Sequence, residues 1–179
     1  LILVLSFSVS ATDVTLTETN NQLTITEKTL TEFTFINHLS GFQTMNVKTN
    51  AGDFVKLIVS GYGENALKGN AELPVLEELI NIPLESEVSV KIMNKEEKII
   101  SLSDYGIDNL ISPSQPSISK SEDAETVPFF FNEEYYANND FYANKLITTE
   151  FLGKMRGQQL ARISIAPFQY NPVANELKI

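Results

Sequence analysis

The sequence predicts an all-β domain, an antiparallel sandwich or barrel-like sheet, with one long exposed loop. Apolar residues recur at every second position in many short segments, and turn residues separate those segments. No segment carries an amphipathic stripe at helical spacing for more than about two turns. The 179 residues contain neither an internal repeat nor an evident boundary, so we expect a single domain.

The alternating segments give the expected strands. Asn20 and Asn21 separate the first two and predict a turn there, and a glycine-containing turn is expected at 50–53. The apolar segments 73–76 and 79–83 contain or end in proline, which indicates edge strands, irregular extensions or strand ends. Strands are expected over these segments: 14–16, 23–25, 33–36, 42–47, 54–59, 88–92, 98–102, 145–152 and 158–165.

The segment 112–127 differs in texture, because it is rich in proline and serine and contains a cluster of acidic residues. This composition predicts an exposed, extended loop. An aromatic run follows, which either stacks on sugars or fills the core and holds the loop in place. Its members are Phe129, Phe130, Phe131, Tyr135, Tyr136, Phe141 and Tyr142.

Charge and missing residue types exclude several functions. The 23 acidic and 13 basic residues give a net charge of −10, which argues against binding nucleic acid or an anionic membrane. Without cysteine there is no thiolate nucleophile, and the single histidine, His38, leaves little basis for a catalytic triad. Glu133, Glu134 and Asp140 lack EF-hand spacing, so no metal and no cofactor are expected. We expect no enzyme activity from this chain by itself.

The N-terminal residues allow two interpretations. The apolar run at 1–7, followed by small residues at Val9 and Ala11, is typical of the end of a signal peptide. The same residues alternate as a first strand would. We favour a signal-peptide remnant at 1–11 and a β domain at 12–179, hence an exported chain. The run is too short to span a membrane as a helix.

Several motifs resemble those of gingipain-type propeptides over roughly residues 33–179. The most specific is Ala-Pro-Phe-Gln-Tyr-Asn-Pro at 166–172, which follows an Arg-Gly pair at Arg156 and Gly157. The Leu-Pro and Ile-Pro segments at 69–83, the Pro/Ser-rich loop at 111–120 and the aromatic block after Pro128 occur in the same order.

The resemblance implies a β-sandwich prodomain that keeps a secreted gingipain-like cysteine endopeptidase latent, assists its folding and is removed by proteolysis. The catalytic Cys and His would lie in a following domain, which is the expected partner in cis. The resemblance also implies that Ile118, Ser119 and Lys120 form the inhibitory loop, with Lys120 entering the specificity pocket. The motif residues expected to be structural are Pro74, Arg156, Gly157, Pro167, Tyr170, Asn171 and Pro172.

One alternative stays open. An acidic, exported β-sandwich with an aromatic cluster is also typical of a module that binds carbohydrate or a host protein. A caspase-like Cys/His domain encoded downstream of residue 179 would favour the prodomain.

Overall fold

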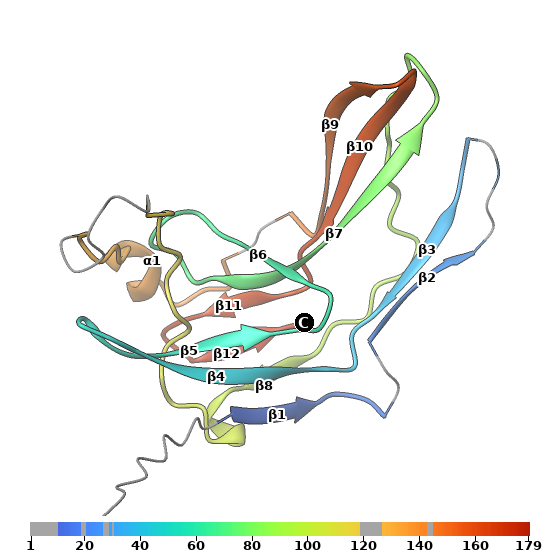
Figure 1. Cartoon of the computed structure of the whole chain (residues 1–179). Coiled ribbons are helices and arrows are strands. Elements are labelled where there is room, and N and C mark those ends of the chain that lie inside the picture. The colour runs from blue at the N-terminus through green and yellow to red at the C-terminus, as the bar shows by residue number, and fades with distance from the viewer. Residues whose placement is uncertain (1–10, 19–20, 27–28, 30, 119–126, 143–144) are drawn as a thin grey trace, which may run out of the picture.

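The computed structural model describes residues 11–18, 21–26, 29, 31–118, 127–142 and 145–179, and its regular secondary structure is almost entirely antiparallel strand (Figure 1). The all-β prediction is therefore confirmed. The two short helical segments are η1 (Ser103–Tyr105) and α1 (Glu133–Ala137). The strands are β1 (Ala11–Thr15), β2 (Gln22–Thr26), β3 (Thr34–His38), β4 (Gly41–Thr49), β5 (Gly52–Ile58), β6 (Gly63–Asn65), β7 (Leu73–Ile82), β8 (Ile99–Ser101), β9 (Ile147–Met155), β10 (Gln158–Ile165), β11 (Gln169–Asn171) and β12 (Glu176–Lys178).

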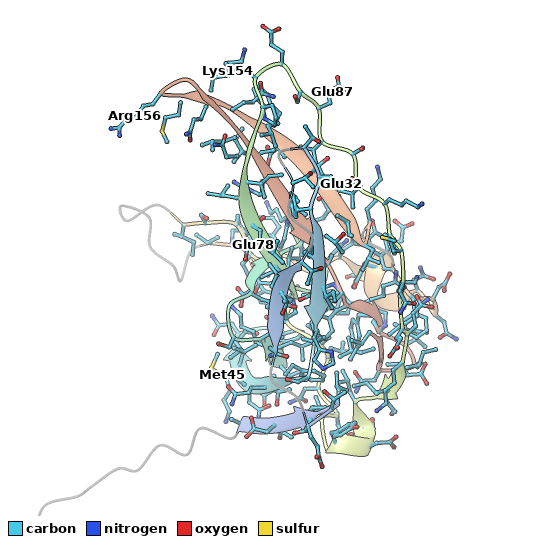
Figure 2. The ribbon with its side chains drawn as sticks, turned by 90° about the vertical axis from the view of Figure 1, so that its right-hand side faces the viewer. Glu32, Met45, Glu78, Glu87, Lys154 and Arg156 are labelled. Carbon is cyan, nitrogen blue, oxygen red and sulfur yellow. The ribbon has the colours of Figure 1, made fainter. Side chains whose placement is uncertain are left out.

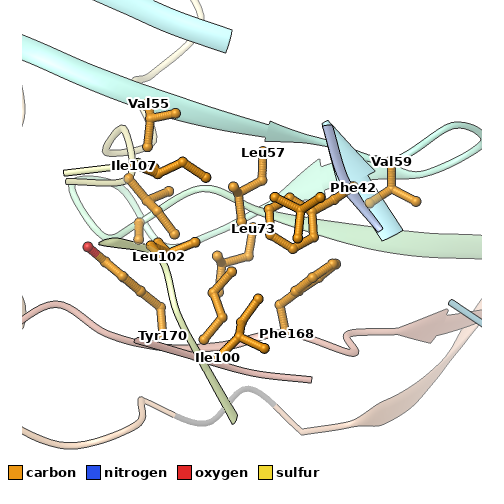
Figure 3. Close-up of a cluster of buried hydrophobic side chains, with 14 of the residues drawn as sticks. Phe42, Val55, Leu57, Val59, Leu73, Ile100, Leu102, Ile107, Phe168 and Tyr170 are labelled. Atoms are coloured by element: carbon orange, nitrogen blue, oxygen red, sulfur yellow. The ribbon is translucent and has the colours of Figure 1, made fainter. Parts of the chain in front are cut away.

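Two three-stranded sheets enclose the main core. One has the order β1-β4-β5 and the other the order β11-β12-β8. Figure 3 shows Phe42 and Leu57 from the first sheet facing Phe168 and Ile100, and the rings of Phe42 and Phe168 meet edge-on at 5.8 Å. Phe168, Leu57 and Tyr170 are almost fully buried. This sandwich is the body of the molecule.

A third sheet, in the order β6-β7-β10-β9, projects from the body as a ribbon (Figure 1). Strand β7 changes partner along its length, because residues 73–75 pair with β6 and residues 76–82 pair with β10. The hairpin β2–β3 covers part of one ribbon face, where Phe33 and Phe35 pack against Ile163 and Ile165. Figure 2 shows Lys154 and Arg156 at the far end of the ribbon.

The prediction that the first two strands pair with each other in a hairpin is wrong. Strand β1 pairs with β4, and β2 pairs with β3. Instead of forming a tight turn, Asn21 accepts a hydrogen bond at 2.6 Å from the backbone N–H of Ser40. A Cβ at Gly41 would collide with the backbone of Val14, so glycine permits the close approach of β4 to β1.

The expected strand at 88–92 is absent. The chain turns back at Glu85 and Ser86, whose backbone groups are bound by the side chain of Gln159 at 3.0 and 2.7 Å. It then runs without strand pairing to Lys98, whose N–H donates to the carbonyl of Ile179 at 2.8 Å. Period-two alternation makes a segment able to form a strand, but a strand also needs a partner, and no strand among the described residues pairs with this segment.

The signal-peptide interpretation concerns residues 1–10 above all, and these lie outside the described residues. Ala11 is the first residue of β1 and lies opposite Met45. Across the described part of the chain, no helix has the length and apolar character to cross a membrane.

Candidate functional site: the neck of the loop

The loop expected at 112–127 leaves the body through a well-anchored first arm. Ile111 is fully buried beside β5, where the N–H of Val55 donates to the carbonyl of Leu110 at 2.9 Å. The N–H of Ser112 returns a bond to the carbonyl of Val55 at 2.7 Å. This pairing continues the sheet edge, so the first arm is fixed up to the point where the loop begins.

A turn at residues 67–70 connects the first arm to the returning second arm. The N–H of Gly69 donates to the carbonyl of Ser114 at 2.9 Å, and the carbonyl of Gly69 accepts from the N–H of Asn132 at 3.0 Å. Gly69 has φ of +83°, and a Cβ there would lie 3.1 Å from the Asn132 nitrogen. Glycine is therefore required both by the backbone conformation and by the close approach of the second arm.

The side chain of Gln115 spans the two arms. Its Oε1 accepts a hydrogen bond from the N–H of Phe130 at 3.0 Å, and its Nε2 donates to the carbonyl of Phe130 at 2.8 Å. The ammonium of Lys68 lies 3.1 Å from the centre of the Phe130 ring, a cation–π contact. We call Gly69, Ser114, Gln115, Phe130 and Asn132 the neck, because they hold together the two ends of the loop.

The second arm is anchored by aromatic packing. Phe129 stacks on Phe54 at 5.5 Å between ring centres, and Phe131 stacks on Tyr136 at 4.3 Å. The hydroxyl of Tyr136 donates to the carbonyl of Ile111 at 2.6 Å, which ties the second arm back to the first. The aromatic run thus packs largely against itself and the body, the second of the two roles expected for it.

Helix α1 begins where the second arm ends. Asn132 caps it, since its Oδ1 accepts from the N–H of Tyr135 at 3.1 Å while its Nδ2 donates to Oδ1 of Asn70 at 2.8 Å. Burial raises the pKa of the Tyr135 and Tyr136 phenols well above their ordinary value, so both stay neutral in the folded chain. The five residues of the neck carry no ionisable side chain, and the charged group in contact with them is the ammonium of Lys68.

Comparison with known proteins identifies the family. The family model Propeptide_C25 matches residues 11–179. This chain belongs to the C25 propeptide family. Being a propeptide, it is a non-catalytic part of a peptidase precursor. Propeptides of this kind precede secreted peptidases, so the chain derives from an exported protein.

Among individual relatives, Lys-gingipain of Porphyromonas gingivalis is 38% identical over 133 residues, covering 74% of this chain and 8% of that protein. Gingipain R1 of the same organism is 30% identical over 115 residues, covering 63% of this chain and 11% of that protein. The propeptide thus spans only a small fraction of the length of the curated relatives it matches.

Two solved structures share the fold. A structure that gives insight into the zymogenic latency of gingipain K from P. gingivalis superposes with a TM-score of 0.90 at 32% identity, covering 95% of this chain and 93% of that one. A complex of the RgpB pro- and mature domains from P. gingivalis superposes at 0.61 with 20% identity, covering 99% and 77%. The second likeness concerns the fold alone.

The three residues expected to form the inhibitory loop lie at or beyond the limit of the described chain. Ile118 has 43% of its surface exposed in the propeptide and is the last described residue of the outgoing arm. Ser119 and Lys120 fall within 119–126, outside the described residues.

The residues expected to be structural in the propeptide occupy two hairpins and two strand ends. Arg156 and Gly157 form the two-residue turn between β9 and β10 with φ of +52° and +79°, the signature of a type I′ turn. Pro74 is fully buried in β7, opposite Glu64 of β6. Pro167 lies half-buried in the connection from β10 to β11.

Tyr170, Asn171 and Pro172 are buried at the start of the β11–β12 hairpin of the propeptide. The Tyr170 hydroxyl donates to Oδ1 of Asn175 at 3.0 Å, and Nδ2 of Asn175 donates to the carbonyl of Ile107 at 2.8 Å. Oδ1 of Asn171 accepts from the N–H of Ala174 at 3.1 Å, which closes the turn. Hydrogen bonds between uncharged groups thus connect β11 and the turn after it to Ile107, which follows η1.

Sequence reasoning did not single out Gln115, Gly69 or Asn132. An asparagine directly before Glu133 and Glu134 is a typical helix N-cap signal and could have placed α1. Gln115 carried no such signal, because a side chain that pairs with the backbone of a residue fifteen positions away leaves no pattern in the sequence. Within the described ranges, no cluster of three or more His, Cys, Asp or Glu side chains could hold a metal ion.

Proposed function

We propose that this chain is the inhibitory and folding-assisting prodomain of a gingipain-like cysteine endopeptidase, and that the loop around Lys120 occupies the active-site cleft of the zymogen. The observation that carries this proposal is the match of residues 11–179 to the propeptide family, supported by the likeness to a gingipain K structure concerned with zymogenic latency. The proposed partner is the catalytic domain of the same precursor, in cis. The proposed place of action is the periplasm, the outer membrane surface or the extracellular space.

The case for Lys120 rests on its isolation in sequence and on the neck. It is the only basic residue between Lys98 and Lys145. Both ends of its loop are fixed to the body, by the Val55 pairing on one side and by the aromatic packing of Phe129 on the other. A loop with fixed ends loses less conformational entropy when it docks than a free peptide does.

The chemistry of lysine fits an inhibitory anchor. A specificity pocket recognises the long side chain by burying its alkyl stem and pairing its ammonium with an acidic group. The relative at 38% identity is named Lys-gingipain. We therefore infer that the cognate peptidase prefers lysine before the scissile bond. Three acidic residues follow within the loop and would make the segment after Lys120 a poor substrate: Glu122, Asp123 and Glu125.

The test is the inhibition constant of the chain against the mature peptidase domain of its own precursor. Lys120→Ala should weaken inhibition by about 2–4 kcal/mol, roughly 30- to 1000-fold, because a buried charged anchor is lost. The inhibition constant of Lys120→Arg should lie between those of the unchanged chain and of Lys120→Ala. Lys91→Ala is the matched control, since Lys91 is an exposed lysine outside the loop and should inhibit as the unchanged chain does.

Equal inhibition by folded Lys120→Ala and the unchanged chain would show that this lysine is not the anchor. Loss of inhibition by Lys91→Ala would instead point to net charge as the cause.

A further inference from the structure

Gln115 is the residue at which the neck closes. Its carboxamide makes a two-way pair with the backbone of Phe130, and Nε2 also lies 3.1 Å from the carbonyl of Pro113. Pro113 is fully buried, so Gln115 lies only two residues beyond a fixed point of the chain. The other partner, Phe130, lies between two rings that pack on Phe54.

The 14 residues from 116 to 129 lie between these two partners. Bringing together two points of a chain that are this far apart in sequence has an entropic cost, which must be met either in the free chain or on binding. Because the Gln115 pair joins the ends in the free chain, that cost is met before any partner arrives.

We propose that Gln115 is a positioning residue for inhibition, whose side chain closes the neck and so fixes where the loop leaves and re-enters the body. This inference rests on the proposed function of the loop. Gln115 acts through the loop and need not touch the peptidase. Without it, the arms stay anchored at Ile111 and Tyr136 and joined through Gly69, but the chain beyond Ser114 loses its direct cross-link to Phe130.

The geometry requires glutamine. The two-way pair needs one acceptor and one donor on the same side chain, together with enough reach to cross to Phe130. Asparagine is one methylene shorter. Glutamate keeps the acceptor for the N–H of Phe130 but presents oxygen, instead of a donor, to its carbonyl. The pair is exposed to solvent, so its contribution to global stability is small.

The experiment uses the full-length precursor and measures its peptidase activity on a lysyl reporter substrate before processing. Gln115→Ala should raise this residual activity about fivefold to tenfold, since two solvent-exposed hydrogen bonds are lost. Gln115→Asn should raise the residual activity as much as Gln115→Ala does, and Gln115→Glu should raise it by an intermediate amount. Gln158→Ala, an exposed glutamine on β10, is the matched control and should leave latency unchanged.

A second measurement separates positioning from general stability. In the Lys120→Ala background, Gln115→Ala should add almost nothing, because the loop no longer carries its anchor. The melting temperature of Gln115→Ala should stay close to that of the unchanged precursor.

The outcomes are distinguishable. Unchanged latency in Gln115→Ala would overturn the positioning role while leaving the proposed function intact. An equal effect of Gln115→Ala with and without Lys120 would assign Gln115 to stability and also overturn it. If Lys120→Ala has no effect on latency but Gln115→Ala does, the proposed anchor fails and the neck positions a different part of the loop.

Discussion

The β11–β12 hairpin and the β9–β10 hairpin were both marked by motifs in the sequence, yet they are held by opposite means. In the first, Tyr170 is fully buried and its hydroxyl joins a chain of hydrogen bonds through Asn175 to Ile107. In the second, Arg156 is exposed at the end of a ribbon, and only its backbone conformation matters to the turn. The two motifs should therefore contribute differently to the free energy of unfolding, because one is buried and the other is exposed.

The ribbon and the body also differ in the ionisable side chains that they bury. The ribbon strands β7, β9 and β10 contain no tyrosine, and Arg162 makes solvent-exposed ion pairs with Glu77 and Glu150 at 3.4 and 3.8 Å. Such pairs contribute little. The body contains Tyr135, Tyr136 and Tyr170 as buried phenols. We therefore expect the body, and not the ribbon, to determine how stability depends on pH.

Alkaline pH should produce the largest effect. Burial raises the pKa of Tyr170 from 10.0 to about 12. Because the folded pKa is the higher one, this stabilisation is complete below pH 10 and is lost as the pH rises toward 12. The loss is on the order of 3 kcal/mol for Tyr170 alone, at ~1.4 kcal/mol per pKa unit. Tyr135 and Tyr136 shift in the same direction.

The measurement is the urea midpoint between about pH 9 and pH 11, together with phenolate absorbance. The midpoint should fall as the pH rises, and the part of the phenolate signal that comes from the buried tyrosines should appear together with unfolding. A midpoint that stays constant across this range would contradict the raised pKa of the buried phenols.

Removing one hydroxyl from the body should have a smaller effect. Tyr170→Phe leaves Oδ1 of Asn175 without its donor in a partly buried site, which should cost about 1 kcal/mol of unfolding free energy. Inhibition by the folded protein should stay nearly unchanged, since Tyr170 is fully buried. Denaturation midpoints and inhibition constants measured side by side test this. A variant with unchanged stability and lost inhibition would place Tyr170 in the interface instead.

The ribbon turn should give the smallest effect. Arg156→Asn should be neutral or stabilising by about 0.5 kcal/mol, because asparagine adopts positive φ more readily than arginine. Gly157→Ala should destabilise by about 1 kcal/mol for the opposite reason. Thermal unfolding of both variants is the measurement. Equal destabilisation by both would mean that the Arg156 side chain itself holds the ribbon.

The sequence predicted local features of this fold, but it did not predict which strands pair with one another. Alternation located β4, β5 and β10, and Arg156-Gly157 marked a turn that is present. The same alternation predicted a strand at 88–92 that has no neighbour. Pro74 suggested an edge or a strand end, and it lies in the part of β7 that only β6 pairs with.

The neck shows the same limit at the candidate site. The proline- and serine-rich composition located the loop, and the aromatic run located its second arm. The pairing of Gln115 with Phe130 and the close approach of Gly69 to Asn132 depend on distant segments meeting. Such contacts are set by the assembled fold, and a single sequence does not display them.

Strand β12 has a consequence for how the chain acquires its structure. It lies between β11 and β8, Leu177 is fully buried, and Ile179 pairs with Lys98 in both directions. The middle strand of one wall of the sandwich is thus supplied by residues 176–178, and its pairing with β8 closes across almost half the sequence. Such long-range pairing forms slowly. During synthesis this wall of the core therefore stays incomplete until residues 176–178 have emerged from the ribosome, so folding of the body follows their synthesis.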